Sequence, residues 1–157
     1  TRANFSAGDV GIGQAFEQIR YDVITQSRDL SALKASVVDM RHRMRANHIV
    51  TAGVFDLKQS EGGIIDVEFI VQFLVLAHAH QYPELTANIG NIGLLGQLAV
   101  LGIIEKAEAD CVAAAYLAFR KLQHASRLQG HSKAQVASSL VQDHADAVKS
   151  LWNKLMA

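Results

Sequence analysis

The sequence predicts an all-α fold, a helical bundle of about five to seven helices with a short β-strand and turn inserted near residues 54–65. Apolar residues recur at spacings of three and four over most of the chain, which is typical of amphipathic helices. Only one stretch favours a strand, and Pro83 is the single proline. Half of the 157 residues are hydrophobic and 19% are charged, a globular composition. We therefore expect residues 1–157 to form one helical domain.

Two amphipathic helices are expected near the start of the chain. The first covers about Asp9 to Gln26, and its apolar stripe is Ile12, Phe16, Ile19 and Val23. The second is capped by either Asp29 or Ser31. Its apolar stripe is Leu33, Val37, Met40 and Met44. Its outer face is expected to be basic, through Arg41, Arg43 and Arg45.

A short strand is expected over residues 54–58, where side chains alternate. Phe55 and Leu57 point to one side, and Val54, Asp56 and Lys58 to the other. A polar turn follows and ends in Gly62 and Gly63, which can adopt a positive φ or admit a close neighbour. Such a short strand needs something to pair with.

The rest of the chain predicts further helices. Residues 66–80 are apolar almost all round, which indicates a helix in the middle of the bundle. The apolar stretch from Ile64 to Ala79 is too short for a bilayer span of about 20 residues. A helix over 91–101, a long helix over 105–128 and a last helix to about Leu155 complete the bundle, and Ser132 is a possible cap for the region up to Leu140.

Charge and cysteine content limit the class of protein. Fifteen basic residues balance fifteen acidic ones, which argues against a whole-surface field for nucleic acid or membrane. Cys111, the one cysteine, allows no internal disulfide and favours the cytoplasm. It lies in an alanine-rich run, where we expect a small buried residue. The chain begins at Thr1 without a signal peptide, which suggests a piece of a longer protein.

Residues 55–69 are the best candidates for chemistry. Lys58 carries a point charge suited to phosphate. Asp66 opens a helix after two glycines, where backbone N–H groups can hold an anion, and carboxylates near phosphate often bind magnesium. The structural alternative is that Asp66 is an N-cap, Asp56 and Lys58 form an exposed ion pair, and Glu68 bonds Gln72 within the bundle. The residues alone leave both interpretations open.

Two stretches carry a family resemblance. Phe55-Asp-Leu-Lys58 and residues 62–72, Gly-Gly-Ile-Ile-Asp-Val-Glu-Phe-Ile-Val-Gln, resemble the signature of bacterial glutamine synthetase adenylyltransferases. That family implies two nucleotidyltransferase units, each followed by a helical domain. One unit transfers AMP from ATP to a tyrosine of glutamine synthetase and the other removes it, under control of a PII signalling protein and glutamine. The resemblance thus implies ATP and Mg²⁺ for the full-length enzyme.

The sequence departs from that family at its catalytic motif. Nucleotidyltransferases of this type need a Gly-Ser turn and an Asp-x-Asp pair to hold two magnesium ions, and the chain has neither. We therefore expect no catalytic residue, no metal ligand and no bound cofactor here, with the catalytic core upstream. The fragment alone is expected to be inactive.

Our hypothesis is that residues 54–66 pack against the missing core and form one wall of its nucleotide site. Lys58 would face phosphate, and Asp56 and Asp66 would orient it or an attendant metal. The full set of wall residues is Asp56, Lys58, Gly62, Gly63, Asp66 and Glu68, with Arg41 and Arg45 beside them. The alternative is a non-catalytic helical module that recognises a protein partner, with the arginines on a solvated face.

Overall fold

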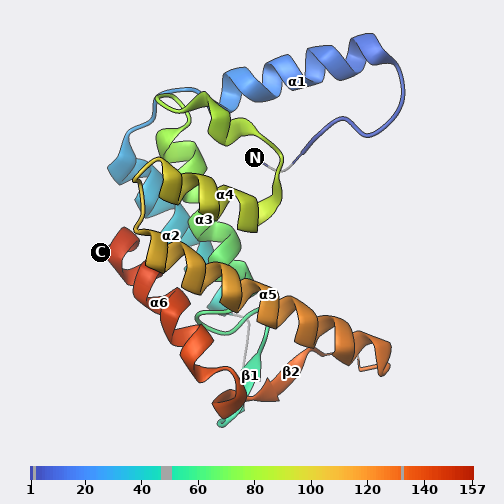
Figure 1. Ribbon diagram of the computed structural model, residues 1–157, viewed down its shortest axis with the longest axis vertical. Helices are drawn as coiled ribbons and strands as arrows, with labels where there is room; N and C mark the ends of the chain where they lie inside the picture. The colour runs from blue at the N-terminus through green and yellow to red at the C-terminus, as the bar shows by residue number, and fades with distance from the viewer. Residues whose placement is uncertain (2, 47–50, 132) are drawn as a thin grey trace.

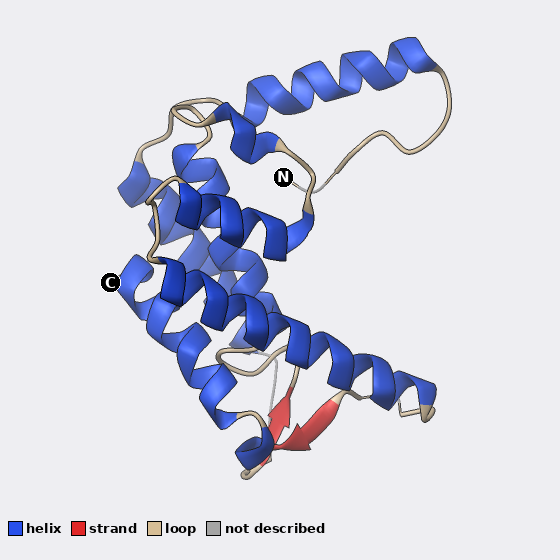
Figure 2. Cartoon of the chain, in the orientation of Figure 1, coloured by secondary structure: helices blue, strands red, loops and turns tan. Residues whose placement is uncertain are grey.

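The structure, a computed structural model, describes residues 1, 3–46, 51–131 and 133–157. Within these ranges it contains six α-helices, as the sequence predicts, and two short strands, of which the sequence predicts only the first (Figures 1 and 2). The helices are α1 (Val10–Ile24), α2 (Leu30–Ala46), α3 (Ile64–His78), α4 (Gly90–Val100), α5 (Lys106–Leu128) and α6 (Gln142–Met156). The strands are β1 (Val54–Asp56) and β2 (Gln135–Ala137), and 3₁₀ turns span Pro83–Thr86 and Ser138–Leu140.

Helix α3 lies at the centre of the bundle and contacts α2, α4, α5 and α6. Val67, Ile70 and Leu74 are at most 1% exposed, so the expectation of a central apolar helix is confirmed. Each fully buried aliphatic side chain of this kind stabilises the fold by about 1.5–3 kcal/mol. Within the described ranges, no helix is both long enough and apolar enough to cross a lipid bilayer.

Helices α5 and α6 pack side by side and cover one flank of α3. Val112, Tyr116 and Phe119 of α5 are buried, as their spacing predicts. At the end of α6, Lys154 Nζ lies 2.8 Å from Glu108 Oε1 and 3.4 Å from Glu105 Oε1. The hydrogen bond from Lys154 holds the pKa of Glu108 below its ordinary value of 4.5. The two helices are therefore linked by a polar contact as well as by their apolar faces.

Acidification is expected to weaken this α5–α6 contact. Because the pKa of Glu108 is lowered in the folded chain, its stabilisation is complete above pH 4.5 and is lost as the pH falls through the lowered pKa. In urea unfolding between pH 6 and pH 3, we expect Lys154→Met to reduce the drop in midpoint relative to the unsubstituted chain. Lys121→Met, an exposed change on α5, is the control. Equal pH dependence in all three chains would contradict the assignment.

The two strands pair antiparallel, in the register Val54↔Ala137, Phe55↔Val136 and Asp56↔Gln135. Two further bonds extend the ladder, Leu57 N–H to the Ala134 carbonyl at 3.0 Å and Ser138 N–H to the Gly53 carbonyl at 2.9 Å. The strand predicted over 54–58 is thus shorter than expected, and its partner lies in this same chain. The expectation of a segment capped by Ser132 and running to Leu140 is wrong for residues 135–140, which form β2 and a 3₁₀ turn. Ser132 itself lies outside the described residues.

Helix α1 lies apart from the main bundle, at the top of Figure 1. Asp9 caps it by accepting the Ile12 N–H at 3.0 Å. Its predicted apolar stripe is not buried, since Ile12 is 71% exposed, Ile19 62% and Val23 49%. The periodicity therefore predicts the helix correctly, but the other described elements leave this face uncovered.

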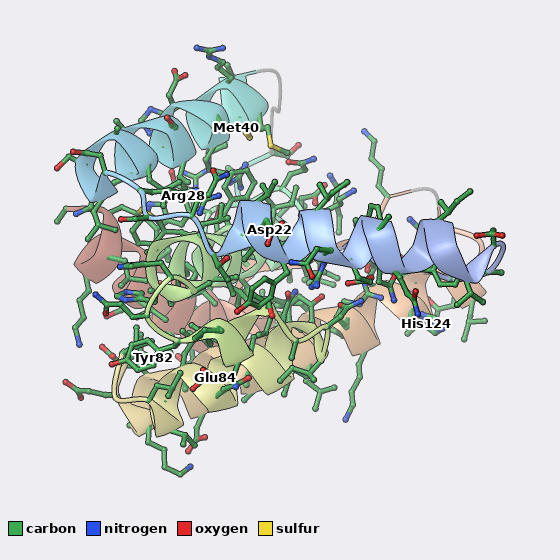
Figure 3. All side chains as sticks on the ribbon, turned by 90° about the horizontal axis from the view of Figure 1, so that it is seen from above. Asp22, Arg28, Met40, Tyr82, Glu84 and His124 are labelled. Atoms are coloured by element: carbon green, nitrogen blue, oxygen red, sulfur yellow. The ribbon has the colours of Figure 1, made fainter. Side chains whose placement is uncertain are left out.

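Helix α2 packs only half of its predicted stripe, Leu33 and Val37, against the core. Asp29 caps it, accepting the Ala32 N–H at 2.7 Å. Met40, labelled in Figure 3, is 56% exposed and Met44 39%, whereas Arg41 is fully buried. The expectation that Arg41 belongs to a basic outer face is therefore wrong. The buried side of α2 follows a spacing of four residues. Arg41 can lie on this side because it pairs with the buried carboxylate of Asp66. Cys111, expected to be buried, is instead exposed on α5.

Candidate functional site

The Asp66 carboxylate forms a buried ion-pair network. Arg41 Nε donates to Asp66 Oδ1, and Arg45 Nη2 donates to Asp66 Oδ2 at 2.8 Å. Arg41 Nη2 also reaches the Gln59 carbonyl at 2.7 Å, and Arg45 Nη1 lies 2.6 Å from Glu61 Oε1. Arg41 is 0% and Asp66 1% exposed. The network therefore fastens α2 to the turn after β1 and to the start of α3.

The two signature glycines have packing reasons to be glycine. Gly62 has φ +79°, and its N–H donates to Asp66 Oδ2 at 2.7 Å. A Cβ on Gly62 would lie 2.3 Å from the carbonyl oxygen of Ala145 in α6, and a Cβ on Gly63 would lie 2.9 Å from the carbonyl oxygens of Leu57 and Ser60. Neither position has room for a side chain. The turn can therefore fit between β1 and α6 only with glycine at both positions.

The start of α3 does not offer free donors to an anion. Gly63 is the N-cap, so Asp66 is not the cap that the sequence suggested. The N–H groups of Ile64 and Ile65 donate to the carbonyls of Leu57 and Lys58, at 2.9 and 3.2 Å. The expectation that these backbone groups hold an anion is therefore wrong, because the turn itself satisfies them.

Asp56 shapes the backbone that carries Lys58. Its Oδ1 accepts the N–H of Lys58 at 2.9 Å and that of Gln59 at 2.8 Å. Asp56 is 8% exposed, so its carboxylate is not the exposed partner that the alternative of an Asp56–Lys58 ion pair assumed. Lys58 is exposed and lies within the turn that follows the strand. A side-chain–backbone turn of this type fixes the direction in which the next residues leave the strand.

Two clefts meet at Lys58. One, of about 420 Å³, lies between the turn, α3 and α5 and is lined by Lys58, Ile64, Glu68, Arg120, Gln123, His124 and Arg127. The other, of about 150 Å³, is lined by Asp56, Lys58, Gln59, Gln123, Arg127, Lys133 and Ala134. Glu68 accepts the Tyr116 hydroxyl at 3.5 Å. Four cations thus face two carboxylates around Lys58, in a chain of zero net charge.

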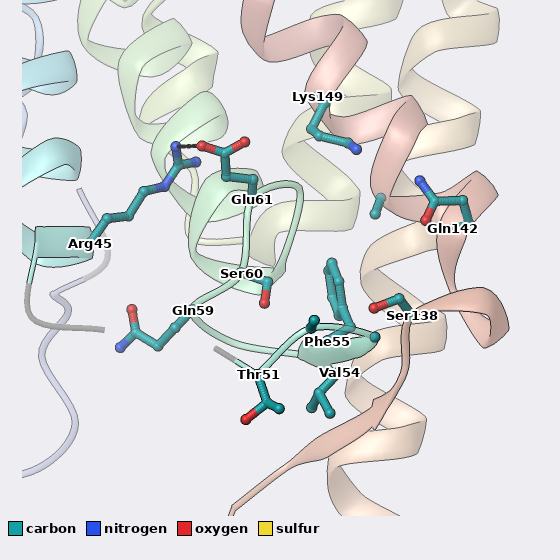
Figure 4. A pocket seen from close by; sticks show the side chains of 13 residues that line it. Arg45, Thr51, Val54, Phe55, Gln59, Ser60, Glu61, Ser138, Gln142 and Lys149 are labelled. Carbon is teal, nitrogen blue, oxygen red and sulfur yellow. Dashed lines mark hydrogen bonds and ion pairs between the residues drawn. The ribbon is translucent and has the colours of Figure 1, made fainter. Parts of the chain in front are cut away.

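A third cleft lies between β1, the turn after it and α6 (Figure 4). It measures about 460 Å³, and Arg45, Glu61, Gln142 and Lys149 are among its lining residues. Arg45 already pairs with Glu61 there, and Lys149 Nζ pairs with Asp146. Its charges are therefore largely matched within the chain.

The structure divides the predicted wall residues into two groups. Asp56, Lys58 and Glu68 line the clefts against α5. Arg41, Asp66 and Gly62 belong to the buried network toward α2 and α6, with Arg45 between that network and the third cleft. Sequence reasoning missed the residues that complete the Lys58 clefts: Arg120, Gln123, His124, Arg127 and Lys133. The spacing of seven residues between Arg120 and Arg127 places both on one face of α5. This spacing is the feature of the sequence that could have identified them.

Comparison with known proteins connects this geometry to a family. A family model described as GlnD PII-uridylyltransferase matches residues 31–153. Among curated proteins, the chain is 46% identical over 155 residues to a bifunctional glutamine synthetase adenylyltransferase/adenylyl-removing enzyme of Burkholderia mallei. It is 47% identical over 152 residues to the enzyme of that name from Aromatoleum aromaticum, and 40% identical over 155 residues to that from Neisseria meningitidis.

These alignments cover 97–99% of the chain but only 16–17% of each relative, so the chain spans about a sixth of the length of the curated relatives it matches. They confirm the resemblance carried by residues 55–58 and 62–72. Since the family model matches most of the chain, the chain belongs to the family described as GlnD PII-uridylyltransferase, and the segment it represents is one found in glutamine synthetase adenylyltransferases.

Proposed function

We propose that this chain is the helical segment of an adenylyltransferase that moves AMP from ATP to a tyrosine of glutamine synthetase. The observation that carries the proposal is the 46% identity, over 99% of the chain, to enzymes whose name states that activity. In this proposal the chain works beside a nucleotidyltransferase core that it does not itself contain. Regulation by a PII signalling protein and location in the cytoplasm belong to the same proposal.

The geometry supports a role for Lys58 at the edge of the nucleotide site. Its side chain is exposed between two clefts, and Asp56 fixes the backbone that carries it. The Asp66 carboxylate fixes the turn, because it accepts hydrogen bonds from Arg41 and from the Gly62 N–H. In this proposal Lys58 meets a phosphate, and Asp56, Asp66, Arg41 and Gly62 are positioning residues.

Magnesium does not fit the described residues. No group of three or more His, Cys, Asp or Glu side chains that could hold a metal occurs among them. Asp66 is committed to two arginines, and Asp56 to two backbone N–H groups. We therefore propose that carboxylates of the core hold Mg²⁺.

Transfer of labelled AMP from ATP to glutamine synthetase tests this function. We expect labelling by the longer protein that includes the core and none by this chain alone. Within the longer protein, Lys58→Ala is expected to slow labelling at least tenfold, because the variant loses a charged contact worth about 1.5–3 kcal/mol. Lys121→Ala, another exposed lysine, should label at the normal rate.

Unchanged labelling by Lys58→Ala would remove Lys58 from the site, and labelling by this chain alone would place catalytic groups within it. Asp66→Asn is unsuited to this assay, because loss of a buried ion-pair partner would lower folding and activity together.

A second candidate is a helical module that only recognises a protein partner. The exposed apolar face of α1 favours it, since Ile12, Phe16 and Ile19 are 38–71% exposed. Changing Ile12 and Ile19 to Ser should then weaken binding of glutamine synthetase while labelling of a free tyrosine peptide is unchanged. The interaction role is excluded if Lys58→Ala lowers the labelling of glutamine synthetase and of the free peptide equally, while the α1 changes lower neither labelling rate.

A further inference from the structure

We infer that the two clefts joined at Lys58 form one site for the phosphate chain of a nucleotide, with Arg120 and Arg127 of α5 as its anchors. This inference rests on the proposed function and deepens it. It adds residues outside the signature segment and names the part of the ligand that they bind. The assignment comes from the charge of the lining, from the spacing along α5 and from the size of the larger cleft.

The charge of the lining favours an anion. Lys58, Arg120, Arg127 and Lys133 line the two clefts together with two carboxylates, Asp56 and Glu68. Asp56 accepts two backbone N–H groups and Glu68 accepts the Tyr116 hydroxyl, so both carboxylates have other roles. The whole chain is neutral, so this surplus of two positive charges is a local feature. An anionic ligand would compensate it.

The elements place the cations on opposite sides of the clefts. Arg120, Gln123, His124 and Arg127 follow one face of α5 at spacings of three, four and seven. Arg120 and Arg127 are therefore separated by about 10 Å along the helix axis. Lys58 approaches from the turn after β1, and Lys133 from the segment before β2. A linear chain of phosphates can contact both arginines and Lys58 together more readily than a single phosphate can.

Arginine is the suitable cation for such a ligand. Its planar guanidinium presents a fork of donors that matches two phosphate oxygens, and it gives up its hydration more readily than a lysine ammonium. The larger cleft, of about 420 Å³, falls within the range of small-molecule sites, which is about 300–1,000 Å³. A cleft of this size suits a small polyanion better than the flat acidic surface of a protein.

Calorimetric titration of the 157-residue chain with inorganic triphosphate, ATP, AMP and adenosine tests the inference. Triphosphate and ATP should bind with similar affinity, AMP more weakly, and adenosine not at all. Arg120→Ala and Arg127→Ala should each weaken triphosphate binding at least tenfold. Lys121→Ala, the neighbouring exposed residue that lines neither cleft, should change it less than twofold. All three positions are exposed, so thermal unfolding should confirm that each variant is folded.

Several results would overturn the inference. They are no triphosphate binding at millimolar concentration, equal weakening by Lys121→Ala, and ATP binding that adenosine competes with but triphosphate does not. The titration also separates this inference from the proposed function. Triphosphate binding lost in Arg127→Ala, together with normal AMP transfer in Lys58→Ala, would keep the phosphate site and reject the catalytic role of Lys58. Normal binding in Arg127→Ala with impaired transfer in Lys58→Ala would do the reverse.

Discussion

Arg41→Met is expected to lower the free energy of unfolding by about 3 kcal/mol, the lower end of the range for a broken buried ion pair. The buried Asp66 carboxylate loses one guanidinium but keeps Arg45 and the Gly62 N–H as partners. Asp66 is 1% exposed, so water cannot replace the lost guanidinium. The same variant removes the bond to the Gln59 carbonyl. Urea unfolding followed by circular dichroism measures the effect.

The matched control is Arg43→Met, two residues further along α2 on its exposed side. Arg43 is 79% exposed and pairs only with Asp39 among the described residues, so we expect a change within about 0.5 kcal/mol. The double variant Arg41→Met/Asp66→Asn should be less destabilised than the sum of its single variants. The neutral amide introduced at position 66 leaves no buried carboxylate without Arg41. Strict additivity would mean that the two groups do not interact.

Gly62→Ala is expected to destabilise the fold by about 3 kcal/mol or more, from two separate causes. A non-glycine residue at a positive φ costs about 1–2 kcal/mol, and crowding in a packed site costs about 1–3 kcal/mol. The crowding is severe, because the new Cβ would lie 2.3 Å from the carbonyl oxygen of Ala145. Thermal or urea unfolding measures the sum.

Gly53→Ala separates the two causes. Gly53 has nearly the same φ, +78° against +79°, but a Cβ there would have nothing within 4 Å. We expect it to show the backbone cost alone, about 1–2 kcal/mol. If Gly62→Ala costs no more than Gly53→Ala, the turn can move away from α6, and the packing explanation for the signature glycine is wrong.

The helical part of the fold could be predicted because each helix carries its own local signal. The almost wholly apolar residues 64–78 belong at the centre, and the stripe of Val112, Tyr116 and Phe119 faces the core. Strand β2 could not be predicted in the same way. Three residues, Gln135, Val136 and Ala137, are too few to give an alternating sequence signal, and only Val136 is half-buried once β1 lies beside it. Tertiary pairing, not local preference, makes this segment a strand.

The candidate site shows the same division. The turn, its glycines and Lys58 could be identified from the sequence, but the burial of Arg41 could not, because it depends on Asp66 arriving from 25 residues away. Likewise, the sequence around Arg120 and Arg127 is that of an ordinary solvated face of α5. Only the packing shows that both arginines line a cleft with Lys58. A surface helix has many charged residues, and only the packing decides which of them converge.

The pairing of β1 with β2 also determines the order in which the molecule can be completed during synthesis. The paired residues Phe55 and Val136 are about 80 positions apart, so the ribosome releases the Lys58 turn long before its partner strand exists. The central helices can collapse earlier from more local contacts, whereas closing so long a loop is slow. Helix α6 also follows β2 in the chain, so the Lys58 turn should stay incompletely packed until the end of the chain is made. A truncated product ending before β2 would lack both the strand that pairs with β1 and the helix that packs on α5 and on Gly62.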